Sequence, residues 1–96
     1  MTALPLQIIW TSQFKRDYRL AMKSGRDIEL LDSVIQRLAN REDLRKEFGD
    51  HALGGNWLGH RELHLAPDWL LVYRVKEDVL ALSLTRTGTH SQILSK

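Results

Sequence analysis

Three strand-like segments follow one another in the C-terminal half of this chain and restrict the folds open to it. The segments 57–65, 69–75 and 79–86 are rich in leucine, valine and aromatic residues. Three residues separate them at each turn, at 66–68 and again at 76–78. Connections this short join neighbouring antiparallel strands, so the chain is predicted to contain a three-stranded antiparallel meander.

Two amphipathic helices are predicted before the meander. An apolar run at 6–10 predicts a strand that leads directly into the first helix, because Thr11 and Ser12 are both suitable N-caps. Gly25 is expected to end that helix. Its apolar face is predicted to hold Phe14, Tyr18, Ala21 and Met22, and its charged face Lys15, Arg16, Asp17, Arg19 and Lys23.

The second helix has the most regular helical period in the sequence. Asp27 is its predicted N-cap, and the helix is expected to stop near Asn40. The link at 24–26 is short enough to favour an antiparallel helical hairpin. The apolar stripe of this helix consists of Ile28, Leu31, Val34, Ile35 and Leu38.

The order of the predicted elements is β, α, α, β, β, β, which is typical of an α+β domain. With 96 residues, of which 43% are hydrophobic, the chain is expected to form a single domain over 1–96 with one core. The helical hairpin is predicted to cover one face of a small, mainly antiparallel sheet. The opposite face of that sheet is then free for chemistry.

Charge and cysteine content bear on partners and location. A formal net charge of +2 and an isoelectric point of 9.2 favour an anionic partner only slightly. The chain has no cysteine, which excludes disulfides and thiolate metal sites and fits a reducing compartment. It shows no signal-like N-terminus and no apolar run of about 18 residues. We therefore expect a cytoplasmic protein with no membrane association.

All four histidines lie between positions 51 and 90. His51 falls in a predicted loop, His64 lies near the end of a predicted strand, and His90 follows a glycine-containing turn. The two-residue period of the strand places His60 and Glu62 on the same face as His64, away from the leucines. Histidine has an ordinary pKa of about 6.5 and exchanges protons near neutral pH. This clustering indicates acid–base chemistry.

RNA cleavage without a metal requires a base for the 2'-hydroxyl, an acid for the departing 5'-oxygen and a cation for the phosphate. The C-terminal half contains all three kinds of group. His51, His64 and His90 are the candidates for proton transfer, and Asp68 is a candidate to orient one of them. The candidates for binding RNA are Arg86 and Arg61 on the phosphate and Trp69 on a base, although burial in the core is the more frequent fate of such a tryptophan.

Simple alternation leaves the direction of Arg86 open. In a regular strand its side chain shares the predicted core face with Leu80, Leu82 and Leu84, where a phosphate ligand would be misplaced. A bulge or a strong twist near Thr85 would turn it to the other face.

A metal site is the main alternative explanation of the histidines. His60 and His64 have the spacing that places two ligands on one face of a helix. On a strand the same four residues span roughly 13 Å, whereas zinc holds each ligand nitrogen within about 2.1 Å. Because a strand is predicted here, we expect no metal and no cofactor.

Four short motifs resemble the YafQ-like branch of the RelE/ParE toxin superfamily, with a matching order of elements over nearly the whole chain. The motifs are Asp50-His51, Gly59-His60-Arg61-Glu62-Leu63-His64, Pro67-Asp68-Trp69 and Arg86-Thr87-Gly88-Thr89-His90. The resemblance implies a RelE-like fold and the toxin of a type II toxin-antitoxin system. Such toxins are ribosome-dependent endoribonucleases that cut mRNA in the decoding site and are inhibited by a cognate antitoxin. The complex with the antitoxin is further expected to bind its own operator DNA.

The resemblance also assigns roles to individual residues. The matching site positions are His51, His64, Asp68, Arg86 and His90. His51 or His64 is implied as the base, His90 with Asp68 as the group that serves the leaving oxygen, and Arg86 as the phosphate ligand.

Two positions differ from related toxins, which carry an aromatic residue at the position of Leu94 and commonly a tyrosine at that of His60. Both differences bear on substrate preference more than on activity.

Two other functions remain open on the sequence alone. One is a non-enzymatic toxin that inhibits a protein target such as gyrase, in which case the histidines are incidental. The other is an inactive member of the family that acts only in a regulatory complex with its antitoxin. Arrest of protein synthesis as opposed to DNA synthesis, and cleavage of ribosome-bound messages, distinguish these functions from an mRNA interferase.

Overall fold

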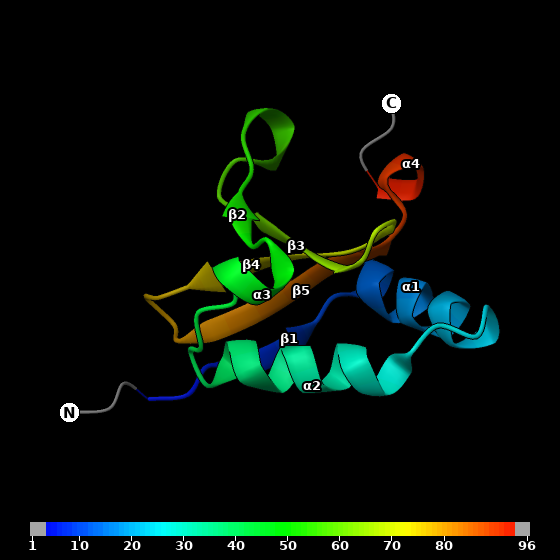
Figure 1. Ribbon diagram of the computed structural model, residues 1–96. Helices are drawn as coiled ribbons and strands as arrows, with labels where there is room; N and C mark the ends of the chain where they lie inside the picture. Colours follow the sequence, from blue (N-terminus) through cyan, green and yellow to red (C-terminus); the bar gives the residue numbers. More distant parts are fainter. Residues whose placement is uncertain (1–3, 94–96) are drawn as a thin grey trace.

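A computed structural model describes residues 4–93 and shows a five-stranded sheet with helices packed against it (Figure 1). The strands are β1 (Gln7–Trp10), β2 (His51–Ala52), β3 (Arg61–Ala66), β4 (Trp69–Lys76) and β5 (Ala81–Gly88), and their order across the sheet is β1-β5-β4-β3-β2. β1 runs parallel to β5, and the other neighbours are antiparallel. The predicted α+β fold and its meander β3-β4-β5 are confirmed.

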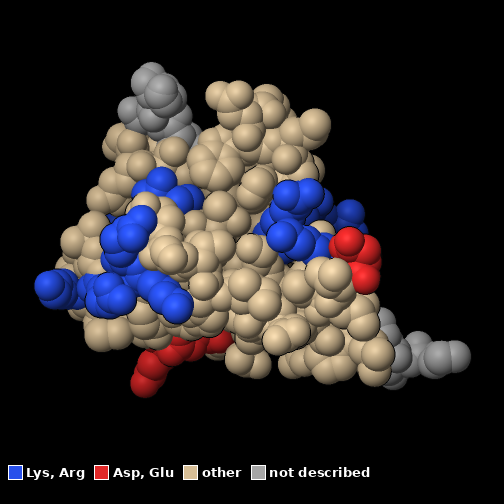
Figure 2. Space-filling view, turned by 180° about the vertical axis from the view of Figure 1, so that it is seen from behind, with Lys and Arg blue, Asp and Glu red and all other residues tan. Residues whose placement is uncertain are grey.

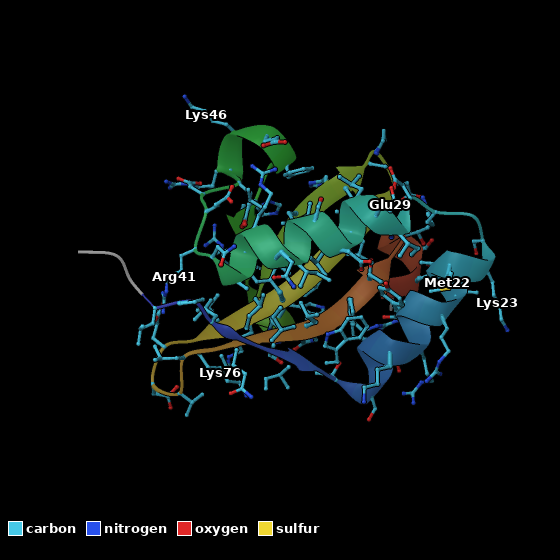
Figure 3. The ribbon with its side chains drawn as sticks, turned by 90° about the horizontal axis from the view of Figure 1, so that it is seen from below. Met22, Lys23, Glu29, Arg41, Lys46 and Lys76 are labelled. Atoms are coloured by element: carbon cyan, nitrogen blue, oxygen red, sulfur yellow. The ribbon has the colours of Figure 1, made fainter. Side chains whose placement is uncertain are left out.

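Two helices of twelve residues each, α1 (Ser12–Lys23) and α2 (Ile28–Ala39), form the predicted hairpin. Their N-caps are Thr11 and Asp27, and each side chain accepts a hydrogen bond from the backbone N–H three residues further on. Figure 3 shows α2 crossing one face of the sheet with α1 to one side, and Lys23 pointing away from the body of the protein.

The buried face of α1 differs from the predicted one. Phe14 and Ala21 are buried as expected, but Met22 is 53% exposed and Asp17 is 8% exposed. The reason is the location of α1, which packs mainly against β5 and continues past the end of the short strand β1. The apolar stripe of α2 is confirmed, with Leu31, Val34, Ile35 and Leu38 buried.

The apolar side chains form two clusters, one on each face of the sheet. The larger cluster lies between the sheet and the helices and includes Phe14, Leu31, Leu63, Leu71 and Leu84. On the opposite face Leu70, Val72 and Ile93 form a small cluster, against which Leu53 and Trp57 pack. That second face is covered only in part, which leaves polar residues of the sheet accessible there.

The segment between α2 and β3 is more ordered than the sequence indicates. A helical turn, α3 (Arg45–Phe48), precedes the short strand β2, and a 3-10 turn, η1 (Gly55–Trp57), follows it. The predicted strand 57–65 therefore begins four residues late, at Arg61. His60 lies before β3 and packs edge-to-face on Trp57, with 5.4 Å between ring centroids. The prediction that His60 shares a strand face with Glu62 and His64 is wrong for this reason.

The last strand contains the irregularity suspected at Thr85. Val72 pairs with Arg86 while the next residue of β4, Tyr73, pairs with Leu84, so β5 has one extra residue at Thr85. The predicted strand 79–86 begins late, after a turn in which Leu80 has a φ of 52°, and it extends to Gly88 because 87 and 88 pair with β4.

His90 begins the short helix α4 (His90–Ile93), and Leu94 lies outside the described residues. Within residues 4–93, no helix is long and apolar enough to cross a membrane.

Candidate active site

One row of residues crosses four strands on the open face of the sheet. His51 of β2 pairs with Glu62 of β3, Glu62 with Val72 of β4, and Val72 with Arg86 of β5. Residues directly opposite in an antiparallel sheet point to the same face, and neighbouring strands lie about 4.8 Å apart. The bulge at Thr85 therefore turns Arg86 toward the face of Glu62, while Leu84 remains in the core.

His64 joins this row from the same strand as Glu62, and His90 follows β5. The ring centroids of His51 and His64 are 6.0 Å apart, and those of His64 and His90 are 5.8 Å apart. The side chains are 51%, 36% and 49% exposed in the order 51, 64 and 90. Three of the four histidines therefore form one open cluster, centred on His64.

Asp68 lies in the turn between β3 and β4 and is hydrogen-bonded to His90. Its Oδ1 accepts the backbone N–H of His90 at 3.2 Å and lies 3.3 Å from the Nδ1 of the same residue. These two hydrogen bonds, from the backbone first and then from the ring, lower the pKa of Asp68 below its ordinary value. An ionised carboxylate only accepts hydrogen bonds, so Nδ1 carries the proton and Nε2 is the unprotonated nitrogen of the neutral ring.

His51 is oriented by the backbone. Its Nδ1 lies 2.8 Å from the carbonyl oxygen of Gly49, which can only accept, so Nε2 points toward the cluster. Gly49 has a φ of 64° and ends α3, and a Cβ at this position would lie 3.4 Å from Nδ1 of His64. The glycine thus satisfies both a left-handed turn and a close contact with the site.

Glu62 lies within the candidate site but is not among the residues predicted from the sequence. Its side chain is 5% exposed, and Oε2 lies 3.5 Å from Nε2 of His51 and 3.7 Å from Nε2 of His64. Its other oxygen, Oε1, is buried without a hydrogen-bond partner in the described part of the chain. A buried carboxylate oxygen without a partner is costly, which makes this residue a candidate for the site. The sequence feature that could have indicated Glu62 is its position between His60 and His64 at alternating positions.

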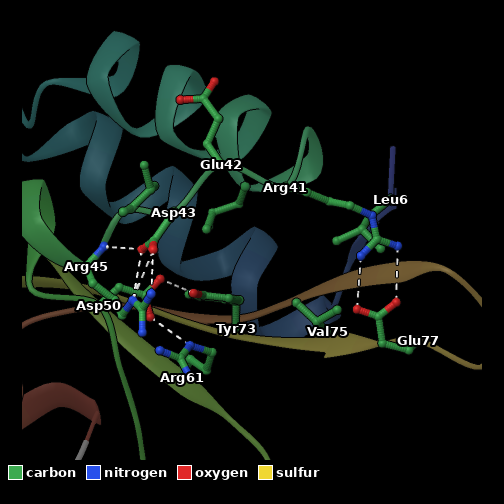
Figure 4. Close-up of a pocket in the computed structure, with 12 residues that line it drawn as sticks. Leu6, Arg41, Glu42, Asp43, Arg45, Asp50, Arg61, Tyr73, Val75 and Glu77 are labelled. Atoms are coloured by element: carbon green, nitrogen blue, oxygen red, sulfur yellow. Dashed lines mark hydrogen bonds and ion pairs between the residues drawn. The ribbon is translucent and has the colours of Figure 1, made fainter. Parts of the chain in front are cut away.

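Arg61 lies on the other face of the sheet and is not part of the histidine cluster. Its Nε donates to Oδ1 of Asp50 at 2.8 Å, and the hydroxyl of Tyr73 donates to Oδ2 of the same carboxylate (Figure 4). Burial, followed by the hydrogen bond to Asp50, raises the pKa of Tyr73. Asp50 and Arg61 each precede a site residue along the chain, so this buried network fixes the strands that carry His51 and Glu62.

Trp69 and His60 are also separate from the cluster. Trp69 is 2% exposed in the main core, with the guanidinium of Arg26 5.3 Å from its ring centroid. Its ring is therefore buried in the core and is not exposed for stacking on a base. The ring of His60 packs against Trp57 and its Nδ1 is buried without a partner among the described residues.

One group of side chains has the geometry to hold a metal ion. Ligand atoms of Glu62, His64 and His90 all lie within 4.8 Å of one another. Two imidazoles and a carboxylate form a ligand set that zinc or copper accepts. The spacing His60-x-x-x-His64 considered from the sequence is not the one that the fold brings together.

The helical hairpin on one face of the sheet and the histidine cluster on the other define a small α+β protein of the RelE-like class. Residues 6–95 match the family model described as the bacterial toxin of type II toxin-antitoxin system, YafQ. The chain therefore belongs to the YafQ toxin family, which confirms the resemblance seen in its motifs.

Individual relatives agree with this assignment. The mRNA interferase toxin YafQ of Escherichia coli K12 is 34% identical over 87 residues, which cover 90% of this chain and 92% of the relative. The toxin in the crystal structure of the E. coli DinJ-YafQ complex has a TM-score of 0.83 at 33% identity, covering 93% of this chain and 97% of that one. A metal-bound toxin from Helicobacter pylori has a TM-score of 0.86 at 39% identity, covering 92% and 98%.

We predict that Tyr73→Phe destabilises the fold by about 1–3 kcal/mol, because it leaves one oxygen of the buried Asp50 carboxylate without its donor. The measurement is the free energy of unfolding from urea denaturation. Tyr18→Phe is the matched control, since it removes a hydroxyl bonded to the exposed Asp32 at 2.8 Å and is expected to cost much less. Equal losses in the two variants would contradict the role of the Asp50 network.

We predict that Asp68 titrates below the ordinary aspartate pKa of about 3.9, and that most of the shift persists in His90→Ala, because the backbone amide is its largest cause. Because the pKa is lowered in the folded state, the ionised carboxylate stabilises the fold above the ordinary pKa of about 3.9. This stabilisation is lost as the pH falls through the lowered pKa of the folded protein. NMR titration of the side-chain carboxyl carbon measures both values. An ordinary pKa in the wild type would refute the hydrogen-bonded arrangement.

Proposed function

We propose that this chain is an mRNA interferase, a ribosome-dependent endoribonuclease that cleaves mRNA in the decoding site by metal-independent acid–base chemistry. The observation that carries the proposal is the cluster of His51, His64 and His90, in which the central ring lies within 6.0 Å of both others. A single phosphodiester that enters this cluster can contact a base and an acid together. The names of the E. coli relatives, which are mRNA interferases, support the same reaction.

The proposed reaction proceeds by attack of the neighbouring 2'-hydroxyl on phosphorus. His51 or His64 removes the hydroxyl proton, a bond forms between O2' and phosphorus, and the bond to O5' breaks. His90 donates a proton to the departing O5' from Nε2, while Asp68 accepts the hydrogen bond from Nδ1 and holds the ring. Arg86 binds the phosphate as charge develops on its oxygens. The products are a 2',3'-cyclic phosphate and a 5'-hydroxyl.

Glu62 is proposed to orient the base. Its Oε2 lies at similar distances from Nε2 of His51 and Nε2 of His64. A carboxylate at that position stabilises a positive charge on whichever imidazole has accepted the proton of the 2'-hydroxyl. Either histidine is therefore supported as the base by the same acidic group.

The surroundings of the cluster suit a nucleic acid held by a larger particle. Figure 2 shows basic side chains gathered over α1, and Lys15, Arg16, Arg19 and Lys23 of this helix are all exposed. These cations are proposed to contact phosphates of the ribosome or message without reading sequence. The ribosome is proposed to present the message to the histidine cluster in the reactive geometry.

The proposed partners besides the ribosome and mRNA are a cognate antitoxin and DNA. The E. coli YafQ toxin has been crystallised in complex with DinJ. An antitoxin that covers the half-exposed histidines would exclude RNA from them and would neutralise the basic surface of α1. The complex is further proposed to bind its own operator, and the toxin to act in the cytoplasm.

We expect His90→Ala to lower cleavage of ribosome-bound mRNA by about 10²–10⁴-fold, because the leaving oxygen loses its acid. The measurement is the rate of appearance of cleaved message on programmed ribosomes, together with growth after expression in cells. His60→Ala is the control and should retain activity.

Binding of the antitoxin by His90→Ala tests that the fold is intact. Full toxicity of this variant would overturn the proposed reaction. Arrest of DNA synthesis with uncut messages would favour inhibition of a protein target such as gyrase.

A transition-metal ion is expected to inhibit this reaction. An ion held by Glu62, His64 and His90 would occupy the nitrogen lone pairs that proton transfer requires. We predict full cleavage in the presence of EDTA and reduced cleavage with added Zn²⁺ or Cu²⁺, measured on the same ribosomal substrate. The H. pylori relative crystallised with metal makes this test relevant. Loss of cleavage in EDTA, restored by one metal, would replace the metal-independent mechanism.

A further inference from the structure

Asp17 is the acidic residue of α1, and it is buried although charged residues surround it in the sequence. Its Oδ2 accepts from Nε of Arg86 at 2.7 Å and from the backbone N–H of Thr87 at 3.1 Å. Its Oδ1 lies 3.3 Å from Nη2 of Arg86 and 3.0 Å from Nε2 of Gln13. The carboxylate therefore receives hydrogen bonds on both oxygens, and two of them come from one guanidinium.

The location of Asp17 follows from the path of the chain after β1. β1 pairs with 81–84 of β5 and ends at Trp10, so the second half of β5 has no strand beside it on that edge. α1 occupies this place. The hydroxyl of Thr11 at its start donates to the carbonyl oxygen of Leu84 and accepts from the backbone N–H of Phe14. The Asp17 carboxylate accepts the hydrogen bond from the backbone N–H of Thr87, which a carbonyl oxygen of a neighbouring strand would otherwise accept.

The same contact fixes the direction of Arg86. The bulge at Thr85 directs the Arg86 side chain to the face of the sheet that also carries Glu62, two strands away. Asp17 binds Nε and Nη2 of the guanidinium in a bidentate arrangement. Among residues 4–93, no protein group accepts a hydrogen bond from Nη1. A phosphate at the histidine cluster is the kind of acceptor that this remaining nitrogen binds.

We propose that Asp17 is a positioning residue that orders Arg86 for the phosphate of the RNA, an inference that rests on the proposed function. A long arginine side chain without this partner samples many rotamers, and each productive encounter must then order it. With Asp17 in place the guanidinium is held before the substrate arrives. The residue acts through Arg86 and does not itself touch RNA.

The alternative is a purely structural role, in which Asp17 only satisfies the edge of β5. The two roles differ in how Asp17 depends on Arg86. A positioning residue loses its effect on cleavage once the residue it positions is removed, whereas a structural residue affects both backgrounds equally. A double-mutant cycle on the cleavage rate therefore separates them.

The experiment compares wild type, Asp17→Asn, Arg86→Ala and the double variant by single-turnover cleavage of mRNA on programmed ribosomes. Asn retains the size of Asp17, but its amide nitrogen cannot accept from the guanidinium. We expect Arg86→Ala to slow cleavage on the order of 10²–10³-fold and Asp17→Asn roughly 10–10²-fold. The double variant should equal Arg86→Ala alone. Asp32→Asn, which makes the same change at an exposed carboxylate bonded to Tyr18, is the matched control and should cleave at the wild-type rate.

A second measurement protects the test against misfolding. The Nε–H of Arg86 should exchange slowly in wild type and rapidly in Asp17→Asn, as seen by NMR of the guanidinium. Asp17→Glu keeps the charge and is expected to show a cleavage rate and an Nε–H exchange rate between those of wild type and Asp17→Asn. If the Asn variant does not fold, the Glu variant takes its place in the double-mutant cycle.

Equal losses from Asp17→Asn in the presence and absence of Arg86, or a wild-type rate in Asp17→Asn, would overturn the inference. Wild-type cleavage in Arg86→Ala would instead remove Arg86 from the proposed reaction.

Discussion

The extra residue at Thr85 determines which side chains of β5 reach each face of the sheet. In an unbroken strand Arg86 would follow Leu82 and Leu84 into the core beneath the helices, where its charge would require a buried partner. The bulge returns Arg86 to the face of Glu62 and leaves Leu84 in the core. The position of α1 depends on the same strand, since Asp17 bonds to residues on the C-terminal side of the bulge. The bulge at Thr85 therefore determines both the packing of the core and the position of Arg86 in the candidate site.

Much of the fold is predictable because local patterns agree with their surroundings. α2 follows its apolar period throughout, since its stripe faces the core along the whole helix. The meander follows from short turns. β3 begins later than predicted because the chain before it forms a 3-10 turn, with positive φ at Gly55 and Gly59. β2 has only two residues and no pattern to reveal it, so His51 was expected in a loop.

The site residues differ in how visible they are in the sequence. The histidines, Asp68 and Arg86 stand out because of their chemistry and because their motifs resemble those of a known family. The buried acids Asp17, Asp50 and Glu62 do not, since single acidic residues in a sequence usually lie in solvent. Only the fold shows that each of them lies against cations, hydroxyls or imidazoles. Arg61 and Trp69 show the opposite case, in which suggestive side chains bond or pack on the far face of the sheet.

The pairing of β1 with β5 has a consequence for the synthesis of this protein. The first strand finds its place only beside the last one, and Arg86 and His90 are among the final residues of the chain. A polypeptide that stops before β5 lacks Arg86, His90 and the strand that carries the bulge, so its first strand has no partner. The edge of the sheet and the cluster of His51, His64 and His90 are therefore completed together, when β5 takes its place beside β1.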